Sequence, residues 1–179
     1  MKTYIALFRG INIVGHHSLP MQQLKSIMEN IGYRHVTTYI QSGNVVFQTP
    51  DTASVKLAEK ISKAIEKAQG FKPEILLLEK KDLQKAINAN PFPQAEPEPK
   101  TLHVLFLAST PTSPDLDKMH AISTATERFK LTDRLFYLHA PDGVGRSKLA
   151  ANAEKLLRVP ATGRNWRTVC KLLEMVEDE

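Results

Sequence analysis

The sequence has a single cysteine, Cys170, so no disulfide can form within the chain. Secreted proteins of modest size commonly depend on disulfides, whereas a lone cysteine is typical of a reducing compartment. Cys170 follows Val169 and precedes Leu172 in an apolar helical pattern. We therefore expect it to pack in the core rather than to act as a reactive thiol.

Long hydrophobic runs are also absent. The apolar stretch after Lys2 is interrupted by Arg9, which makes it too short for a secretory signal. No stretch approaches the roughly 20 apolar residues of a membrane-spanning helix. With 42% hydrophobic and 24% charged residues, the 179-residue chain has the composition of a globular protein with a real core. These features predict a cytoplasmic protein that does not associate with membranes.

The usual motifs of catalysis and metal binding are missing as well. The six histidines lack the spacing of metal ligands, so we predict neither a metal nor another cofactor. No serine lies in a Gly-x-Ser-x-Gly segment, and none of the polar motifs described below contains a carboxylate. Residues 143–148 lack both the Gly-Lys-Ser/Thr order of a P-loop and the third glycine of a dinucleotide-binding loop. The sequence therefore leaves open whether the protein is an enzyme.

The net charge is mildly positive. Lysine and arginine number 24 against 19 aspartates and glutamates, which gives a charge of +5 at pH 7. Such a surface permits a nucleic-acid or phosphorylated partner without requiring one. The lysines of one predicted helix form a stripe that Glu59 and Glu66 interrupt, which favours a solvated helix face over a nucleic-acid site. The stripe consists of Lys56, Lys60, Lys63 and Lys67.

The first half of the chain follows the order β-α-β-β-α-β. Apolar spacing predicts strands over 3–9, 35–40, 43–48 and 74–78, and helices over 20–31 and 52–69. This order is that of the ferredoxin-like split unit, in which the first and third strands are antiparallel neighbours and both helices cover one face. The end of the first strand at Arg9 is therefore expected beside the start of the third at Gly43.

The second half follows the order β-α-β-β-α-α. Strands are predicted over 102–108, 127–131 and 135–139, and no fourth strand is evident. Four prolines between residues 90 and 100 exclude regular structure there and predict an extended linker. We thus expect an α+β protein of two tandem ferredoxin-like subdomains with antiparallel sheets, the second incomplete. The first subdomain comprises residues 1–89, the linker residues 90–100 and the second subdomain residues 101–179. The alternative is a single mixed domain.

One set of polar residues stands where the first strand ends and the third begins. It comprises Arg9, Asn12, Ser42 and Asn44. An arginine suits an anion, and amides and a hydroxyl orient a bound ligand, so this set is a candidate binding site. The alternative is that these residues and the neighbouring glycines only satisfy the geometry of two turns.

A second set of polar residues lies in two segments that each precede a predicted helix. It comprises Arg146, Lys148, Arg164, Asn165 and Arg167. The N-terminus of a helix offers free N–H groups and partial positive charge, so basic residues there predict a phosphate or carboxylate site. The alternative is that these segments bind no ligand and that Ser147 and Thr162 are simply helix caps. Trp166 is expected in the core rather than as a stacking platform.

Four segments of the chain together resemble a bacterial family of domains of unknown function. They are Arg9-Gly-Ile-Asn-Ile-Val-Gly15, Tyr39-Ile-Gln-Ser-Gly-Asn-Val-Val-Phe47, Gly143-Val-Gly-Arg-Ser-Lys148 and Ala161-Thr-Gly-Arg-Asn-Trp-Arg-Thr168. The family pattern has a glycine in place of Val14 and a lysine in place of His16. The resemblance covers nearly the whole chain and implies paired ferredoxin-like subdomains in a cytoplasmic protein. It implies no activity, substrate or catalytic residue.

These observations favour one function and leave two alternatives. The favoured function is binding of a phosphorylated ligand, a nucleotide or a nucleic acid, by the polar turns and the basic helix starts. We do not expect RNA to stack on the sheet, because the third strand has only one aromatic residue, Phe47. One alternative is an enzyme that closes on a small anionic metabolite between its subdomains. The other is a protein-interaction domain, which an exposed apolar patch would mark.

Overall fold

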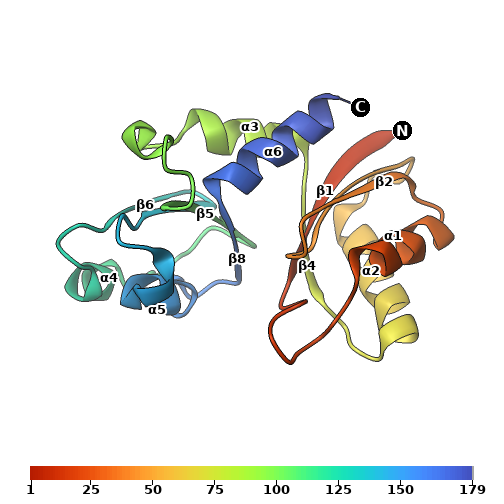
Figure 1. The fold of residues 1–179 in the computed structure, drawn as a ribbon, viewed down its shortest axis with the longest axis horizontal. Helices are drawn as coiled ribbons and strands as arrows, with labels where there is room; N and C mark the ends of the chain where they lie inside the picture. The colour runs from red at the N-terminus through yellow and green to blue at the C-terminus, as the bar shows by residue number, and fades with distance from the viewer. Residues whose placement is uncertain (179) are drawn as a thin grey trace. The chain divides into compact units, whose positions relative to one another are not determined.

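The computed structural model describes residues 1–178 and has two compact units (Figure 1). The first comprises Met1–Gln84 and the chain from Leu172 onward, and the second comprises Lys85–Lys171. Each contains one antiparallel four-stranded sheet, in the order β2-β3-β1-β4 in the first and β6-β7-β5-β8 in the second. The predicted α+β class with two ferredoxin-like sheets is confirmed. The subdomain bounds predicted from the sequence stay a prediction.

The elements of the first unit follow the predicted order closely. They are β1 (Lys2–Arg9), α1 (Met21–Asn30), β2 (Arg34–Tyr39), β3 (Asn44–Thr49), α2 (Ser54–Gln69), β4 (Glu74–Leu78) and the start of α3 (Lys80–Asn88). β1 is a central strand, paired with β3 along one edge and with β4 along the other, and its apolar residues are buried on both faces of the sheet.

Alternate residues of β1 point to the two helices that cover this sheet. Tyr4 and Phe8, each 1% exposed, belong to a core that α1 and α2 complete. The helices contribute Leu24, Met28, Leu57, Ile61 and Ile65. The rings of β1 are therefore enclosed, and this sheet face is closed to a stacked base.

The second unit contains the remaining elements. They are the end of α3, η1 (Pro93–Ala95), β5 (Leu102–Leu107), α4 (Leu116–Ile122), β6 (Arg128–Thr132), β7 (Leu135–His139), η2 (Val144–Arg146), α5 (Lys148–Leu157), β8 (Ala161–Asn165) and the start of α6 (Trp166–Glu177). Helices α4 and α5 pack on one face of the sheet, against Phe136 and Leu138. On the opposite face the hydroxyl of Tyr137 donates to the carbonyl of Ala86 in α3 at 2.6 Å.

Two predictions about this half were wrong. The second sheet is complete, because Ala161–Asn165 forms a fourth strand that pairs with β5 and places Gly163 opposite Leu105. The segment lacks apolar alternation, so only its partner strand makes it extended. The proline-rich stretch also contains a short 3₁₀ helix, since Pro93 stands in its first turn, where proline needs no N–H partner. Among the described helices, none combines the length and apolar character that crossing a membrane requires.

Candidate functional site

The first predicted polar set lies where β1 ends and β3 begins, as the sequence predicts. Leu7 stands opposite Asn44, and the N–H of Phe8 donates to the carbonyl of Gly43 at 2.8 Å. Gly43 has φ +80°, and a β-carbon on it would lie 2.6 Å from Cβ of Phe8 and 2.7 Å from Cδ1 of Ile11. The approach of the two turns therefore requires glycine at this position.

The side-chain amide of Asn12 holds these two turns together. Its Nδ2 donates to the carbonyl of Leu19 at 2.9 Å and to the carbonyl of Gln41 at 2.8 Å. Its Oδ1 accepts from the N–H of Leu19 at 2.7 Å. Both amide donors are thus occupied by the backbone, which ties the loop after β1 to the turn before β3.

The other members of the first set also bond to their own unit. Asn44 is fully buried, and its Nδ2 donates to the carbonyl of Tyr39 at 3.1 Å and to Oγ of Ser42 at 2.9 Å. Nη1 of Arg9 lies 3.0 Å from Oε2 of Glu74, which stands opposite it on β4. The sequence did not indicate Glu74, because only strand pairing brings it to Arg9. A ligand-binding role for this set stays a prediction.

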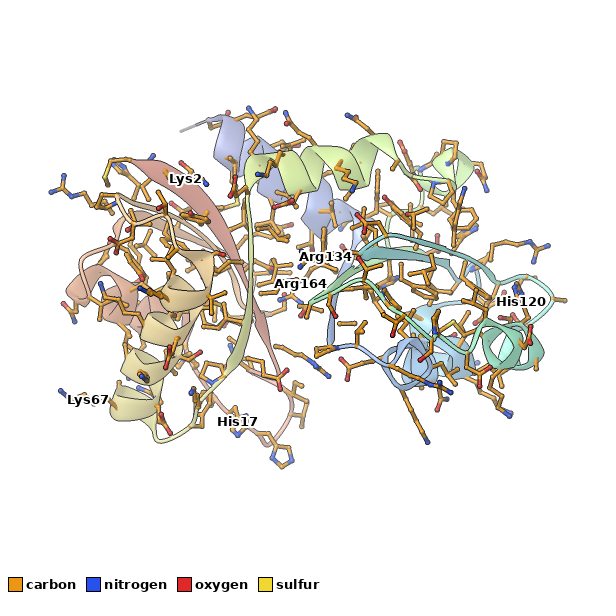
Figure 2. All side chains as sticks on the ribbon, turned by 180° about the vertical axis from the view of Figure 1, so that it is seen from behind. Lys2, His17, Lys67, His120, Arg134 and Arg164 are labelled. Carbon is orange, nitrogen blue, oxygen red and sulfur yellow. The ribbon has the colours of Figure 1, made fainter. Side chains whose placement is uncertain are left out.

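The loop after β1 borders an open hollow of about 590 Å³. The ring of His17 stacks on Phe71 with centroids 4.4 Å apart and planes 6° apart, and the loop carrying it is seen in Figure 2. Ile13 and Val14 beside it are 59% and 97% exposed. The hollow is lined by Asn12, Ile13, Gly15, His16, His17, Ser18 and Gln41. Its accessible surface is therefore partly apolar and carries no fixed positive charge.

The second predicted set lies at one edge of the second sheet. β7 and β8 both end there, since His139 stands opposite Leu102 and Asn165 stands opposite the next residue of β5, His103. The chain leaves β7 for η2 and α5, and it leaves β8 directly for α6. Because only β5 lies between β7 and β8, the two strand ends are about 10 Å apart. The segments that lead to α5 and α6 therefore leave the sheet at the same edge.

Each of these helices has a side-chain cap. Oγ of Ser147 accepts from the N–H of Ala150 at 3.0 Å, which confirms Ser147 as a cap. Oδ1 of Asn165 accepts from the N–H of Thr168 at 2.9 Å. The prediction that Thr162 caps a helix was wrong, because Thr162 is buried within β8. A cap satisfies only part of the first turn, and the remaining N–H groups keep the positive potential of the helix start.

Three basic residues of this edge project into solvent. Arg146, Lys148 and Arg167 are exposed, and none forms an ion pair with any residue that the structure describes. By contrast, Lys85 of the same unit pairs with Asp133 at 2.9 Å. These three cations are therefore available to an anion.

Other charged groups of the edge are already engaged. Arg164 is half-buried, and its Nη1 donates to the carbonyl of Gly163 at 2.8 Å. Burial lowers the pKa of Arg164 to about 10, so it stays charged at neutral pH. The carboxylate of Asp142 accepts from the hydroxyl of Thr126 at 2.6 Å. Arg164 is thus held by the backbone, while Asp142 is directed toward the β6 side of the sheet.

Lys100 is a candidate that the sequence reasoning missed. It is exposed and stands just before β5, the strand between β7 and β8. The sequence predicts a linker over the proline-rich stretch, and only the sheet order shows that its last residue lies at this edge. Glu98, also exposed, lowers the positive charge there.

The remaining single-residue predictions have mixed outcomes. Trp166 is 4% exposed and lies in the core, as predicted. Cys170 is half-buried in α6 rather than fully enclosed. Within residues 1–178, no three His, Cys, Asp or Glu side chains gather in a way that could hold a metal ion.

Comparison with known proteins identifies a family and a shared fold. Residues 1–137 match the model of a family described as protein of unknown function (DUF1697). No curated protein matches the chain. The solved structure of the conserved bacterial protein SP0830 from Streptococcus pneumoniae resembles it with a TM-score of 0.68. The two chains are 23% identical, and the match covers 97% of this chain and 98% of that one. At this identity the likeness shows the fold alone.

Proposed function

The chain belongs to the DUF1697 family of proteins of unknown function, and we propose that it binds a phosphorylated ligand, a nucleotide or a nucleic acid. The binding surface is the edge of the second sheet that carries Arg146, Lys148 and Arg167. The supporting observation is that these three cations are exposed and have no carboxylate partner within residues 1–178. We also propose a cytoplasmic location, on the ground of the single cysteine.

Several features of the edge suit phosphate. The guanidinium groups of Arg146 and Arg167 can each donate two parallel hydrogen bonds to one phosphate. Lys148 stands in the first turn of α5, where its ammonium adds to the positive potential of the helix start. Asn165 fixes the beginning of α6 as its cap. Strand ends about 10 Å apart suit an extended ligand with more than one phosphate.

Fluorescence anisotropy with labelled single-stranded RNA and DNA, at about 50 and about 200 mM salt, tests this proposal. We expect binding that weakens steeply with salt. Replacing Arg146, Lys148 and Arg167 together with alanine removes three phosphate contacts, so the slope of log affinity against log salt should fall by about 2. A labelled nucleotide is the second probe.

The matched control replaces three exposed lysines elsewhere, Lys67, Lys118 and Lys130, with alanine. Lys67 projects from α2 of the first unit (Figure 2). The control changes net charge by the same amount and should leave the salt slope unchanged. An equal decrease of the salt slope in both variants would show that the overall charge, and not this edge, attracts the ligand. Absence of binding to all three probes by the unmodified protein would contradict the proposal.

A specific observation supports protein interaction as a second candidate function. Ile13, Val14 and Ile40 are 59%, 97% and 50% exposed, and the bond from Asn12 to Gln41 brings their loop and turn together. Ile40 has φ +48°, which a β-branched residue rarely adopts. Sedimentation velocity tests whether a second copy covers this apolar patch. Association lost on replacing Ile13 and Val14 with serine supports this function, and a monomer at all concentrations argues against self-association.

A further inference from the structure

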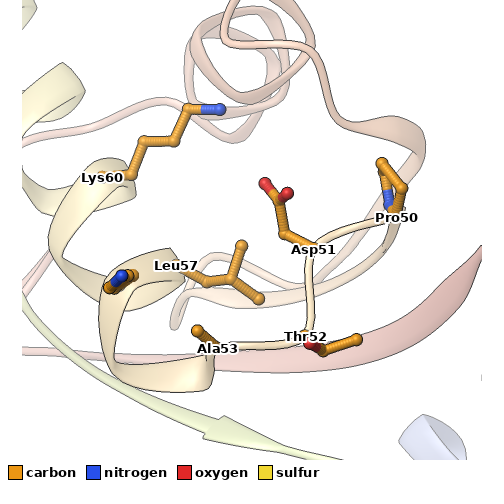
Figure 3. A pocket seen from close by; sticks show the side chains of 7 residues that line it. Pro50, Asp51, Thr52, Ala53, Leu57 and Lys60 are labelled. Carbon is orange, nitrogen blue, oxygen red and sulfur yellow. The ribbon is translucent and has the colours of Figure 1, made fainter.

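A pocket of about 430 Å³ opens at the start of α2 in the first unit (Figure 3). It lies at the sheet edge opposite to the polar turns, where β3 ends and the chain turns into the helix. Its lining residues are Pro50, Asp51, Thr52, Ala53, Lys56, Leu57 and Lys60. None of these residues belongs to the surface proposed above.

The start of α2 leaves backbone donors unsatisfied at this pocket. The residue before the helix, Ala53, cannot cap it with a side chain, and the first turn contains no acidic residue. The first helical hydrogen bond runs from the N–H of Leu57 to the carbonyl of Ala53. The N–H groups of residues 54–56 therefore have no partner within residues 1–178. They carry the partial positive charge of a 16-residue helix.

Two lysines one helical turn apart face the same space. Lys56 and Lys60 line the pocket, and neither forms an ion pair with a described residue. The ammonium of Lys60 lies over the ring of Tyr33, 5.1 Å from its centroid. The side chains of Lys60 and Asp51 both extend into the open space of the pocket (Figure 3).

Tyr33, whose ring lies under the ammonium of Lys60, provides an independent observation. Its side chain is 3% exposed, yet its hydroxyl has no hydrogen-bond partner within the described residues. Tyr33 immediately precedes β2. Because Arg34 of β2 pairs with Gln48 of β3, Tyr33 lies beside the end of β3, from which the chain continues to Asp51. Burial, and secondly the carboxylate of Asp51, raises the pKa of Tyr33 to about 12. Buried hydroxyls nearly always have a partner, so this one requires an explanation.

We propose that this pocket binds a phosphate group that retains one proton, as monohydrogen phosphate does. The N–H groups of residues 54–56, with Lys56 and Lys60, take the negatively charged oxygens. When Lys60 turns from the ring of Tyr33 toward the phosphate, the tyrosine hydroxyl donates to the same group. The carboxylate of Asp51 accepts from the P–O–H and repels an oxyanion that has no proton to donate. The site therefore selects phosphate over sulfate.

A titration followed by ¹H–¹⁵N correlation spectra tests this proposal on the full chain at about pH 8, where methyl phosphate has lost its second proton. Sodium phosphate, sodium sulfate and methyl phosphate are compared at an ionic strength matched with sodium chloride. With phosphate, the amide signals of Ser54, Val55 and Lys56 should shift and saturate. Sulfate and methyl phosphate should bind at least about tenfold more weakly, because neither can donate to Asp51. Equal binding of the three anions would overturn the role of Asp51.

Five variants separate this site from general charge effects. Replacing Lys56 and Lys60 with alanine should abolish saturable binding, whereas the same change at Lys63 and Lys67 of the same helix should not. Asp51→Asn should make sulfate bind as well as phosphate, because an amide can donate to either. Tyr33→Phe removes only a hydroxyl without a partner, so the fold persists while phosphate binds several-fold more weakly.

The fifth variant, the alanine triple at Arg146, Lys148 and Arg167, should leave the phosphate titration unchanged. Failure of the nucleic-acid experiment and failure of this one are therefore distinguishable. Phosphate shifts no larger than those with chloride at residues 54–56 would overturn the proposal. Equal weakening by the Lys63 and Lys67 changes would overturn it too.

Discussion

Asn12 was predicted to bind a ligand, and in the folded chain its side chain has a structural role. A polar side chain after a strand is compatible with either role, and the sequence does not reveal which backbone groups lie within its reach. The folded chain places the carbonyls of Leu19 and Gln41 and the N–H of Leu19 around one amide. The amide pattern of asparagine, two donors and one acceptor, matches that set.

We predict that Asn12→Ala lowers the free energy of unfolding by about 1–3 kcal/mol, because three backbone groups lose their partner. Asn12→Asp should cost at least as much, since a carboxylate placed against two carbonyl oxygens repels them. Urea denaturation measures both changes. A difference of less than about 0.5 kcal/mol from the unmodified protein would show that the amide does not hold the turns together.

Gly43 and Gly10 form a matched pair for testing the close approach of the turns. Both have positive φ, +80° and +72°, but only Gly43 has atoms within 4 Å of an added β-carbon. Gly10→Ala should cost about 1–2 kcal/mol from the left-handed backbone alone. Gly43→Ala should cost clearly more, because Phe8 and Ile11 must also move. Similar denaturation midpoints for the two variants would contradict the packing seen here.

At the scale of elements, a helix or strand could be predicted where the residues of that segment alone determine its secondary structure. β1 and α2 were predicted because apolar residues recur at strand or helix spacing and bury one face or both. β8 was missed because Ala-Thr-Gly-Arg-Asn lacks that alternation and includes a glycine. Its extended form depends on pairing with β5, which is a tertiary effect. The same kind of pairing puts Glu74 beside Arg9 and Lys100 at the second edge.

The start of α2 provides a prediction for a whole helix. Ala53→Asp introduces a carboxylate at the N-cap position, where it can accept from the unsatisfied N–H groups of the first turn. We expect it to raise the free energy of unfolding by about 0.5–2 kcal/mol and to prevent phosphate from shifting the amides of residues 54–56. Thermal denaturation and the phosphate titration check the two effects. A cap that stabilises α2 yet leaves phosphate binding intact would place the anion elsewhere.

At the scale of the whole molecule, two buried tyrosines couple stability to alkaline pH. Burial raises the pKa of both Tyr33 and Tyr137 to about 12. Unfolded tyrosines ionise near pH 10, so between about pH 10 and 12 the unfolded chain binds fewer protons than the folded one. The contribution of these two groups to the free energy of unfolding should therefore be fully present below pH 10. It should be lost as the pH rises from about 10 to 12.

Urea denaturation at a series of alkaline pH values measures this fall. The double variant Tyr33→Phe and Tyr137→Phe lacks both ionising hydroxyls, so its stability should decline less steeply over the same range. The side chain of Tyr137 also donates to Ala86, so the variant is compared by its slope and not by its absolute stability. Identical slopes would show that the two hydroxyls ionise as they do in the unfolded chain.

The sequence predicted two ferredoxin-like subdomains because the order β-α-β-β-α recurs in both halves, although it missed the fourth strand of the second sheet. It also predicted the residues at the second edge, since helix starts and basic side chains are visible locally. Their exposure and lack of partners depend on the folded chain. The pocket at α2 was not predicted, because Lys56 and Lys60 belong to a stripe with the appearance of a solvated helix face. Only packing brings Tyr33 to that stripe.

The most direct measurement is the salt dependence of nucleic-acid binding by the unmodified protein and the two alanine triples. We expect steep dependence for the unmodified protein and for the variant at Lys67, Lys118 and Lys130. The slope for the variant at Arg146, Lys148 and Arg167 should be lower by about 2. Equal slopes for the two triples, or no binding by the unmodified protein to RNA, DNA or nucleotide, would contradict a phosphorylated-ligand site at the edge where β7 and β8 end.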